Sequence, residues 1–116
     1  MTEKVYKTPA EIVPHRLAIG GIVYEVEQVD GLRDPDNNQK LNGMIRHSRS
    51  RITIDGELSR QVKQQVLWHE VLHAILMQTG FDDQDERMLD CLSHGIMGVL
   101  LHNREMRDWL IEEQGG

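Results

Sequence analysis

The chain has 116 residues and a mass of 13.4 kDa, the size of one small domain. Hydrophobic residues make up 39% and charged residues 28%, which excludes a disordered or fibrous chain. Lys and Arg number 13 against 19 Asp and Glu, so the net charge is −6. This balance argues against nucleic-acid or anionic membrane partners, because both attract a surplus of Lys and Arg.

Cys91 is the single cysteine, which excludes an intramolecular disulfide and a cysteine-based zinc knuckle. The first fifteen residues contain no apolar signal-peptide core. No segment approaches the roughly 18 consecutive apolar residues of a membrane span. We therefore expect one soluble, cytoplasmic domain over residues 1–116.

The first half of the chain has the patterns of β-strands. Two short apolar runs flank Gly20-Gly21, which predicts a β-hairpin. The polar stretch 30–42 predicts a loop, and Ser48-Arg49-Ser50 predicts a turn between two further strands. The predicted strands comprise residues 17–19, 22–27, 44–47 and 51–55.

After Gly56 the apolar pattern becomes helical. Ser59 is a suitable N-cap for a first helix, and Gly80 lies where a glycine commonly ends one. A second helix is predicted from about Gln84 to about Leu101, and a short third helix from Arg104 to Glu112. The expected fold class is α+β: a small, mostly antiparallel sheet of three or four strands followed by three helices.

Two further expectations concern the packing of the second helix. Gly95 and Gly98 lower the intrinsic stability of a helix, so their presence indicates a close approach of the two long helices. Cys91 is expected to pack as a small hydrophobic residue.

The sharpest motif is His69-Glu70-Val71-Leu72-His73, an H-E-x-x-H pattern on the first predicted helix. Residues four apart lie on one face of a helix, so both imidazoles can approach one Zn²⁺. Glu70 lies about 100° around the helix from His69, beside the metal, where it can take a proton from water. The alternative is a pair of core histidines satisfied by hydrogen bonds.

A catalytic zinc usually has three protein ligands, so a third is needed. Glu86 and Asp90 lie four apart on one stripe of the second helix. Glu86 can complete a His₂Glu site, and Asp90 can accept the outer N–H of a ligand histidine. His94 is a rival ligand and a candidate for stabilising an oxyanion. The alternative for both acidic residues is an exposed helix charge.

H-E-x-x-H followed by E-x-x-x-D on the next helix resembles the gluzincin pattern of zinc metallopeptidases. The short spacing resembles the minigluzincins and the compact ImmA/IrrE-like metallopeptidases of bacteria and phages. The resemblance implies a zincin-like fold, a Zn²⁺ held by His69, His73 and Glu86, Glu70 as general base, and Asp90 as a supporting partner. The ImmA/IrrE pattern has Ala-Asn where this chain has Leu89-Asp90.

The expected function is therefore a zinc-dependent metallopeptidase that hydrolyses a protein or peptide substrate. One of the last two predicted strands is expected to present an edge to the peptide. Three alternatives remain: a catalytically silent zincin-fold interaction module, a purely structural zinc site, and a ribonuclease of the YbeY type. A structural site would need His94 or Asp90 as a fourth ligand.

Arg46, Arg49 and Arg51 form a local basic run in an acidic chain. We expect a solvated hairpin; the alternative is contact with phosphate or with an acidic substrate segment. His47 is expected to be an exposed residue at the end of a strand, although it could also reach the cleft.

Overall fold

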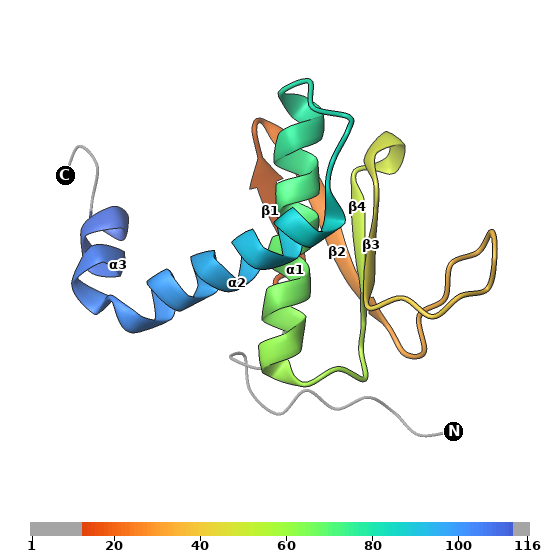
Figure 1. Cartoon of the computed structure of the whole chain (residues 1–116), viewed down its shortest axis with the longest axis horizontal. Helices are drawn as coiled ribbons and strands as arrows, with labels where there is room; N and C mark the ends of the chain where they lie inside the picture. The colour runs from red at the N-terminus through yellow and green to blue at the C-terminus, as the bar shows by residue number, and fades with distance from the viewer. Residues whose placement is uncertain (1–12, 113–116) are drawn as a thin grey trace.

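The computed structural model describes residues 13–112, a four-stranded sheet followed by three helices (Figure 1). The strands are β1 (Arg16–Ile19), β2 (Ile22–Val29), β3 (Gly43–Arg46) and β4 (Arg51–Asp55). The helices are α1 (Arg60–Gln78), α2 (Glu86–His102) and α3 (Arg104–Ile111), with a 3₁₀ turn, η2 (His47–Arg49), between β3 and β4. The predicted α+β class is confirmed. Residues 1–12 and 113–116, which the predicted domain also includes, lie outside the described residues.

The strand order in the sheet is β1-β2-β4-β3. β1 and β2 form the predicted antiparallel hairpin, with Gly20 and Gly21 at φ +57° and +88°, values that glycine adopts without a steric penalty. β3 and β4 are also antiparallel, whereas β2 and β4 run parallel, with Val26 opposite Ile52. The sheet is therefore mixed, because it contains both antiparallel and parallel pairs. β4 lies between β2 and β3, and β3 is at an edge.

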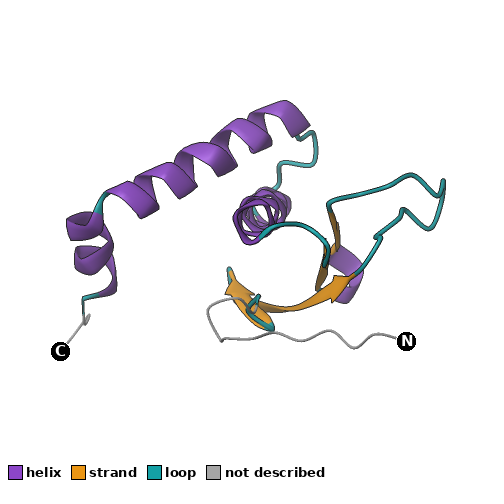
Figure 2. Cartoon of the chain, turned by 90° about the horizontal axis from the view of Figure 1, so that it is seen from below, coloured by secondary structure: helices purple, strands orange, loops and turns teal. Residues whose placement is uncertain are grey.

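Helix α1 covers one face of the sheet (Figure 2). The core beneath it is built from alternate residues of the two central strands, as the period of a β-strand requires. Its buried members include Tyr24 and Val26 from β2, Ile52 and Ile54 from β4, and Ala74 from α1. This packing fixes α1, and with it the H-E-x-x-H motif, against the sheet.

A buried carboxylate ties the loop 30–42 to the other face of the sheet. The Asp55 side chain is fully buried and accepts hydrogen bonds from the backbone N–H of Gly31 (3.2 Å) and of Glu57 (3.0 Å). Lys40 Nζ donates a third, at 2.8 Å. Burial by itself raises the pKa of Asp55, but these hydrogen bonds outweigh it and hold the pKa below its usual value.

Asp55→Ala is expected to lower the free energy of unfolding by about 1–3 kcal/mol, because it leaves buried donors without an acceptor. The Asp55 pKa is lower in the folded state, so its contribution is complete above about pH 4 and is lost as the pH falls through that lower pKa. Urea denaturation of both proteins between pH 7 and pH 2 measures this difference. Asp36→Ala, in an exposed turn, is the control and should change stability little. A constant difference across this pH range would contradict the assignment.

The first half of α2 crosses α1, and the remainder extends away from it toward α3 (Figures 1 and 2). A Cβ atom added to Gly95 or to Gly98 would meet nothing within 4 Å, so the expected close helix approach at these glycines is wrong. Cys91 is exposed, so its predicted packing is also wrong. Within residues 13–112, no helix combines the length and hydrophobicity needed to cross a membrane.

Candidate metal centre

Capping residues set the ends of the two helices that carry the motif residues. Ser59 Oγ accepts a hydrogen bond from the Val62 N–H at the start of α1, and Gly80 lies just beyond its end with φ +91°. The Asp85 carboxylate caps α2 by accepting from the Met88 N–H at 3.1 Å. The first turn of α2 therefore begins directly after this cap, with Glu86 as its first residue.

The structure brings together the side chains of His69, His73 and Glu86. His69 Nε2 lies 2.8 Å from Glu86 Oε1, and His73 Nε2 lies 3.0 Å from Glu86 Oε2. The two Nε2 atoms are 3.1 Å apart. Four ligands at about 2.0–2.1 Å from a zinc ion are separated by roughly 3.3 Å, so these donor atoms lie slightly closer together than zinc ligands do and near enough to share one ion. Among the described residues, these three side chains offer a group of donor atoms suited to a metal ion. The donor atoms all lie within 4.8 Å of one another.

The outer nitrogens of both rings have polar neighbours. His69 Nδ1 lies 2.7 Å from Asp90 Oδ1, although this contact lacks the direction of a hydrogen bond. His73 Nδ1 is hydrogen-bonded to Gln84 Oε1, an oxygen that only accepts, so Nδ1 carries the proton. The other ring nitrogen, His73 Nε2, lies 3.0 Å from Glu86 Oε2. The Gln84 amide is oriented in turn, because its Nε2 donates to the carbonyl of Phe81.

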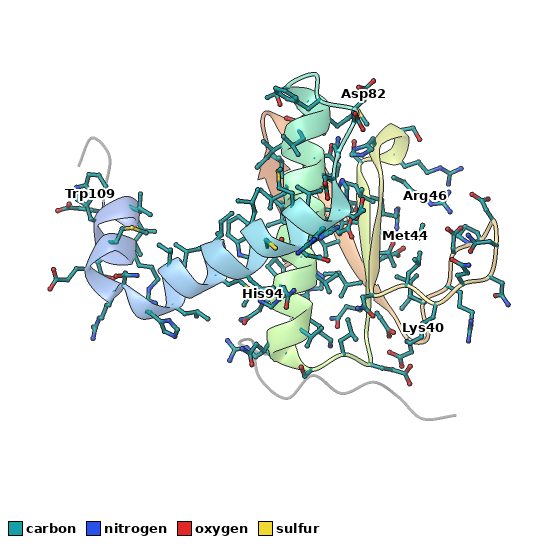
Figure 3. All side chains as sticks on the ribbon, in the orientation of Figure 1. Lys40, Met44, Arg46, Asp82, His94 and Trp109 are labelled. Carbon is teal, nitrogen blue, oxygen red and sulfur yellow. The ribbon has the colours of Figure 1, made fainter. Side chains whose placement is uncertain are left out.

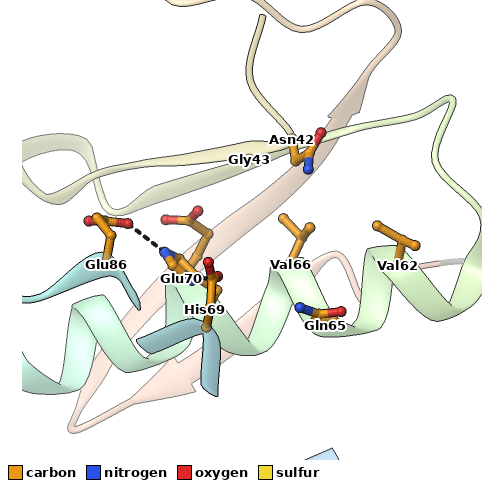
Figure 4. A pocket seen from close by; sticks show the side chains of 9 residues that line it. Asn42, Gly43, Val62, Gln65, Val66, His69, Glu70 and Glu86 are labelled. Atoms are coloured by element: carbon orange, nitrogen blue, oxygen red, sulfur yellow. Dashed lines mark hydrogen bonds and ion pairs between the residues drawn. The ribbon is translucent and has the colours of Figure 1, made fainter. Parts of the chain in front are cut away.

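Glu70 is the buried member of the group, with 6% of its surface exposed. Figure 4 shows it beside His69, on the side of α1 that faces the strand carrying Gly43. A Cβ atom at Gly43 would lie 3.2 Å from Glu70 Oε2 and 2.5 Å from Val66 Cγ1, so only glycine fits there. The Glu70 carboxylate makes no hydrogen bond or ion pair with the residues that the structure describes.

The electrostatics of the two glutamates differ. Burial raises the pKa of Glu70 to about 7; the nearby His69 and His73 oppose this shift, and the charges of Glu86 and Asp90 add to it. For Glu86, partial burial raises the pKa, but the hydrogen bonds and charges of the two histidines outweigh it and lower the pKa overall. Glu86 is therefore ionised at neutral pH, as a metal ligand must be.

A cavity of about 340 Å³ opens beside these residues, between α1, the start of α2 and the edge strand β3. Glu70, His69 and Glu86 line one part of it, and Asn42 and Gly43 line the part next to β3 (Figure 4). The cavity is large enough to admit a few atoms of a bound chain next to the three donor side chains.

The structure separates His94 from this cluster. His94 is exposed on α2, and its nitrogens are not among the donors that lie within 4.8 Å of one another (Figure 3). His47 is half-buried in η2, not exposed at a strand end; burial and then the charge of His73 lower its pKa. Its position therefore differs from the predicted one, and it lies on the side of the site near His73.

Sequence reasoning missed two residues at the site. Gln84 was included only in the start of a predicted helix, and its spacing of two from Glu86 was the one available signal. Gly43 carried no signal in the sequence, because its role depends on how β3 packs against α1. Both positions follow from tertiary contacts and not from a local pattern.

The chain was compared with protein-family models, with curated proteins and with solved structures, and none of these comparisons found a match. The site is therefore characterised by its own donor atoms and geometry.

Proposed function

We propose that this protein is a zinc-dependent metallopeptidase of the gluzincin type, with a zincin-like fold. The observation that carries the proposal is the convergence of the His69, His73 and Glu86 donors beside the buried carboxylate of Glu70, which has no hydrogen-bond or ion-pair partner within residues 13–112. Two histidines alone would be satisfied by hydrogen bonds within a core. A third donor that is anionic and lies close to both histidines, together with an adjacent base, favours a metal-assisted hydrolase.

His69 Nε2, His73 Nε2 and the Glu86 carboxylate would hold the ion. When bound, zinc supplies Lewis acidity, which polarises a carbonyl group and acidifies a water molecule. Gln84 holds the ring of His73 by accepting from its Nδ1–H, and Asp90 lies against Nδ1 of His69. A hydrogen-bonded partner such as Gln84 orients a ligand ring and raises its basicity, and Asp90 would act in the same way on His69 if its carboxylate turned to accept from Nδ1–H.

Glu70 is the proposed proton carrier. Its carboxylate takes a proton from the attacking water and then passes it to the amide nitrogen that leaves when the peptide bond breaks. Without a metal the pKa of Glu70 is raised to about 7, and the positive charge of a bound ion would lower it, so the carboxylate would be ionised and able to accept a proton near neutral pH. Burial between α1 and β3 also limits the positions that the carboxylate can adopt.

The proposed substrate is an extended segment of a protein or peptide. β3 is an edge strand of the sheet, so one of its edges is unpaired within the described residues, whereas β4 is paired on both sides. Gly43 of β3 borders the cavity and lies close to Glu70. A peptide added to this edge as a further strand would pass beside the carboxylate.

Removal of the metal is expected to abolish hydrolysis. The test uses a library of fluorescence-quenched peptides and the purified chain loaded with zinc. Treatment with a chelator should eliminate cleavage, and an equimolar addition of zinc should restore it, because the three donors remain in place. Cleavage that persists in the chelated protein would contradict the proposal. A zinc-loaded chain that binds peptides without cutting any would instead identify a catalytically silent interaction module.

A further inference from the structure

A second pocket lies on the face of the sheet opposite α1 and gathers four arginines. Its volume is about 390 Å³, and it is formed by β2, β3, β4, η2 and the loop 30–42. Each arginine comes from a different element, the loop 30–42, β3, η2 and β4; in that order they are Arg33, Arg46, Arg49 and Arg51. Figure 3 shows Arg46 pointing from β3 away from α1, on the side of the loop that carries Lys40.

The charge of this pocket is only partly neutralised. Arg51 pairs with Glu27 at 3.1 Å and with Glu25 at 3.6 Å, and Glu27 is the one carboxylate among the lining residues. Arg46 and Arg49 are exposed and form no ion pair or hydrogen bond with any residue in the range 13–112.

The strand register places like charges against each other at this site. Arg46 is directly opposite Arg51 in the antiparallel pairing of β3 with β4. Like charges at opposed positions of two strands destabilise a sheet. An anion bound between these side chains would remove that repulsion, and guanidinium groups bind carboxylates and phosphates through paired hydrogen bonds.

The pocket also has apolar lining residues. They include Val29, Leu32 and Met44; Leu32 is buried, whereas Val29 is 42% exposed. A small free anion would contact the arginines but leave this surface in water. A ligand that also carries an apolar group would cover both, and the burial of apolar area would add to its affinity.

We propose that this pocket binds an acidic polypeptide segment in which carboxylates flank an apolar side chain. The carboxylates would contact Arg46 and Arg49, and the apolar side chain would lie against the apolar lining residues Val29, Leu32 and Met44. A single-stranded nucleic acid fits less well, because the lining includes no aromatic side chain for base stacking and the whole chain has a charge of −6. The pocket holds none of the proposed zinc ligands, so this binding does not depend on the metal.

The test measures binding by fluorescence anisotropy. The probe is a labelled peptide of about ten residues with one leucine flanked by glutamates, a length that spans a site of this size. The protein is the full chain carrying Glu70→Gln, so that the probe is not cleaved. Adding Arg46→Gln and Arg49→Gln should weaken binding at least about tenfold, because two charge-assisted contacts are lost. Replacing the leucine of the probe with serine should weaken binding about threefold or more.

The matched control pair is Arg60→Gln with Arg104→Gln, which removes the same charge from exposed positions elsewhere. This pair should change the affinity by less than about twofold, since distant surface charges are screened by salt. Equal weakening by both pairs, no binding to the chain with all four arginines, or an unchanged affinity for the serine probe would overturn the proposal. Tighter binding of an oligothymidylate, lost with Arg46→Gln and Arg49→Gln, would assign the pocket to nucleic acid instead.

Discussion

Replacing Glu70 with glutamine is expected to lower the turnover of peptide substrates by about 10²–10⁴-fold, the usual contribution of a general acid–base group. Glutamine has nearly the same shape as glutamate but cannot accept a proton at neutral pH. Glu70 is not one of the three side chains whose donors converge, so the variant should retain its zinc. The result would separate proton transfer from metal binding at adjacent positions of α1.

The measurement is the turnover number on a cleaved peptide, with zinc content determined on the same samples. Glu105→Gln makes the same chemical change on exposed α3 and should leave turnover at the level of the unmodified chain. If Glu70→Gln cleaves as fast as Glu105→Gln, then Glu70 does not carry the proton. If Glu70→Gln loses its zinc, its carboxylate belongs to the metal site instead of standing beside it.

The second large effect is expected at the third ligand. Glu86→Ala should weaken zinc binding by more than about a hundredfold, because it removes the carboxylate that contacts the Nε2 atoms of both His69 and His73. Gln84→Ala removes the acceptor of His73 Nδ1–H but no proposed ligand, so a smaller loss of about 10–100-fold is expected. Competition with a chromophoric chelator gives both affinities. Equal losses in the two variants would contradict the distinction between a ligand and its support.

Much of the fold is predictable from local patterns. Gly20-Gly21 marks the hairpin, and Ser59 and Gly80 mark the ends of α1, because caps and turns depend on a few neighbouring residues. The parallel pairing of β2 with β4 is not predictable in this way, since it joins strands separated by the loop 30–42 and by β3. No local sequence pattern indicates which strand will lie between two others.

The candidate site divides in the same manner. His69, Glu70 and His73 follow from a spacing within one helix, and Glu86 and Asp90 follow from a second spacing within the next. The contact of Gln84 with His73 and the close approach of Gly43 to Glu70 arise only when the helices and β3 are packed together. The glycines of α2 were misread for a related reason: their cost to a helix is local, but whether anything approaches them is not.

The most direct test of a zinc centre is the metal content of the purified chain by elemental analysis. The unmodified protein, Glu86→Ala and His94→Ala are measured side by side. We expect about one zinc per chain in the unmodified protein and in His94→Ala, and a strong loss of zinc in Glu86→Ala. An unmodified chain that contains no zinc, even after refolding in its presence, would contradict the account. It would leave His69 and His73 as histidines paired with Glu86 by hydrogen bonds.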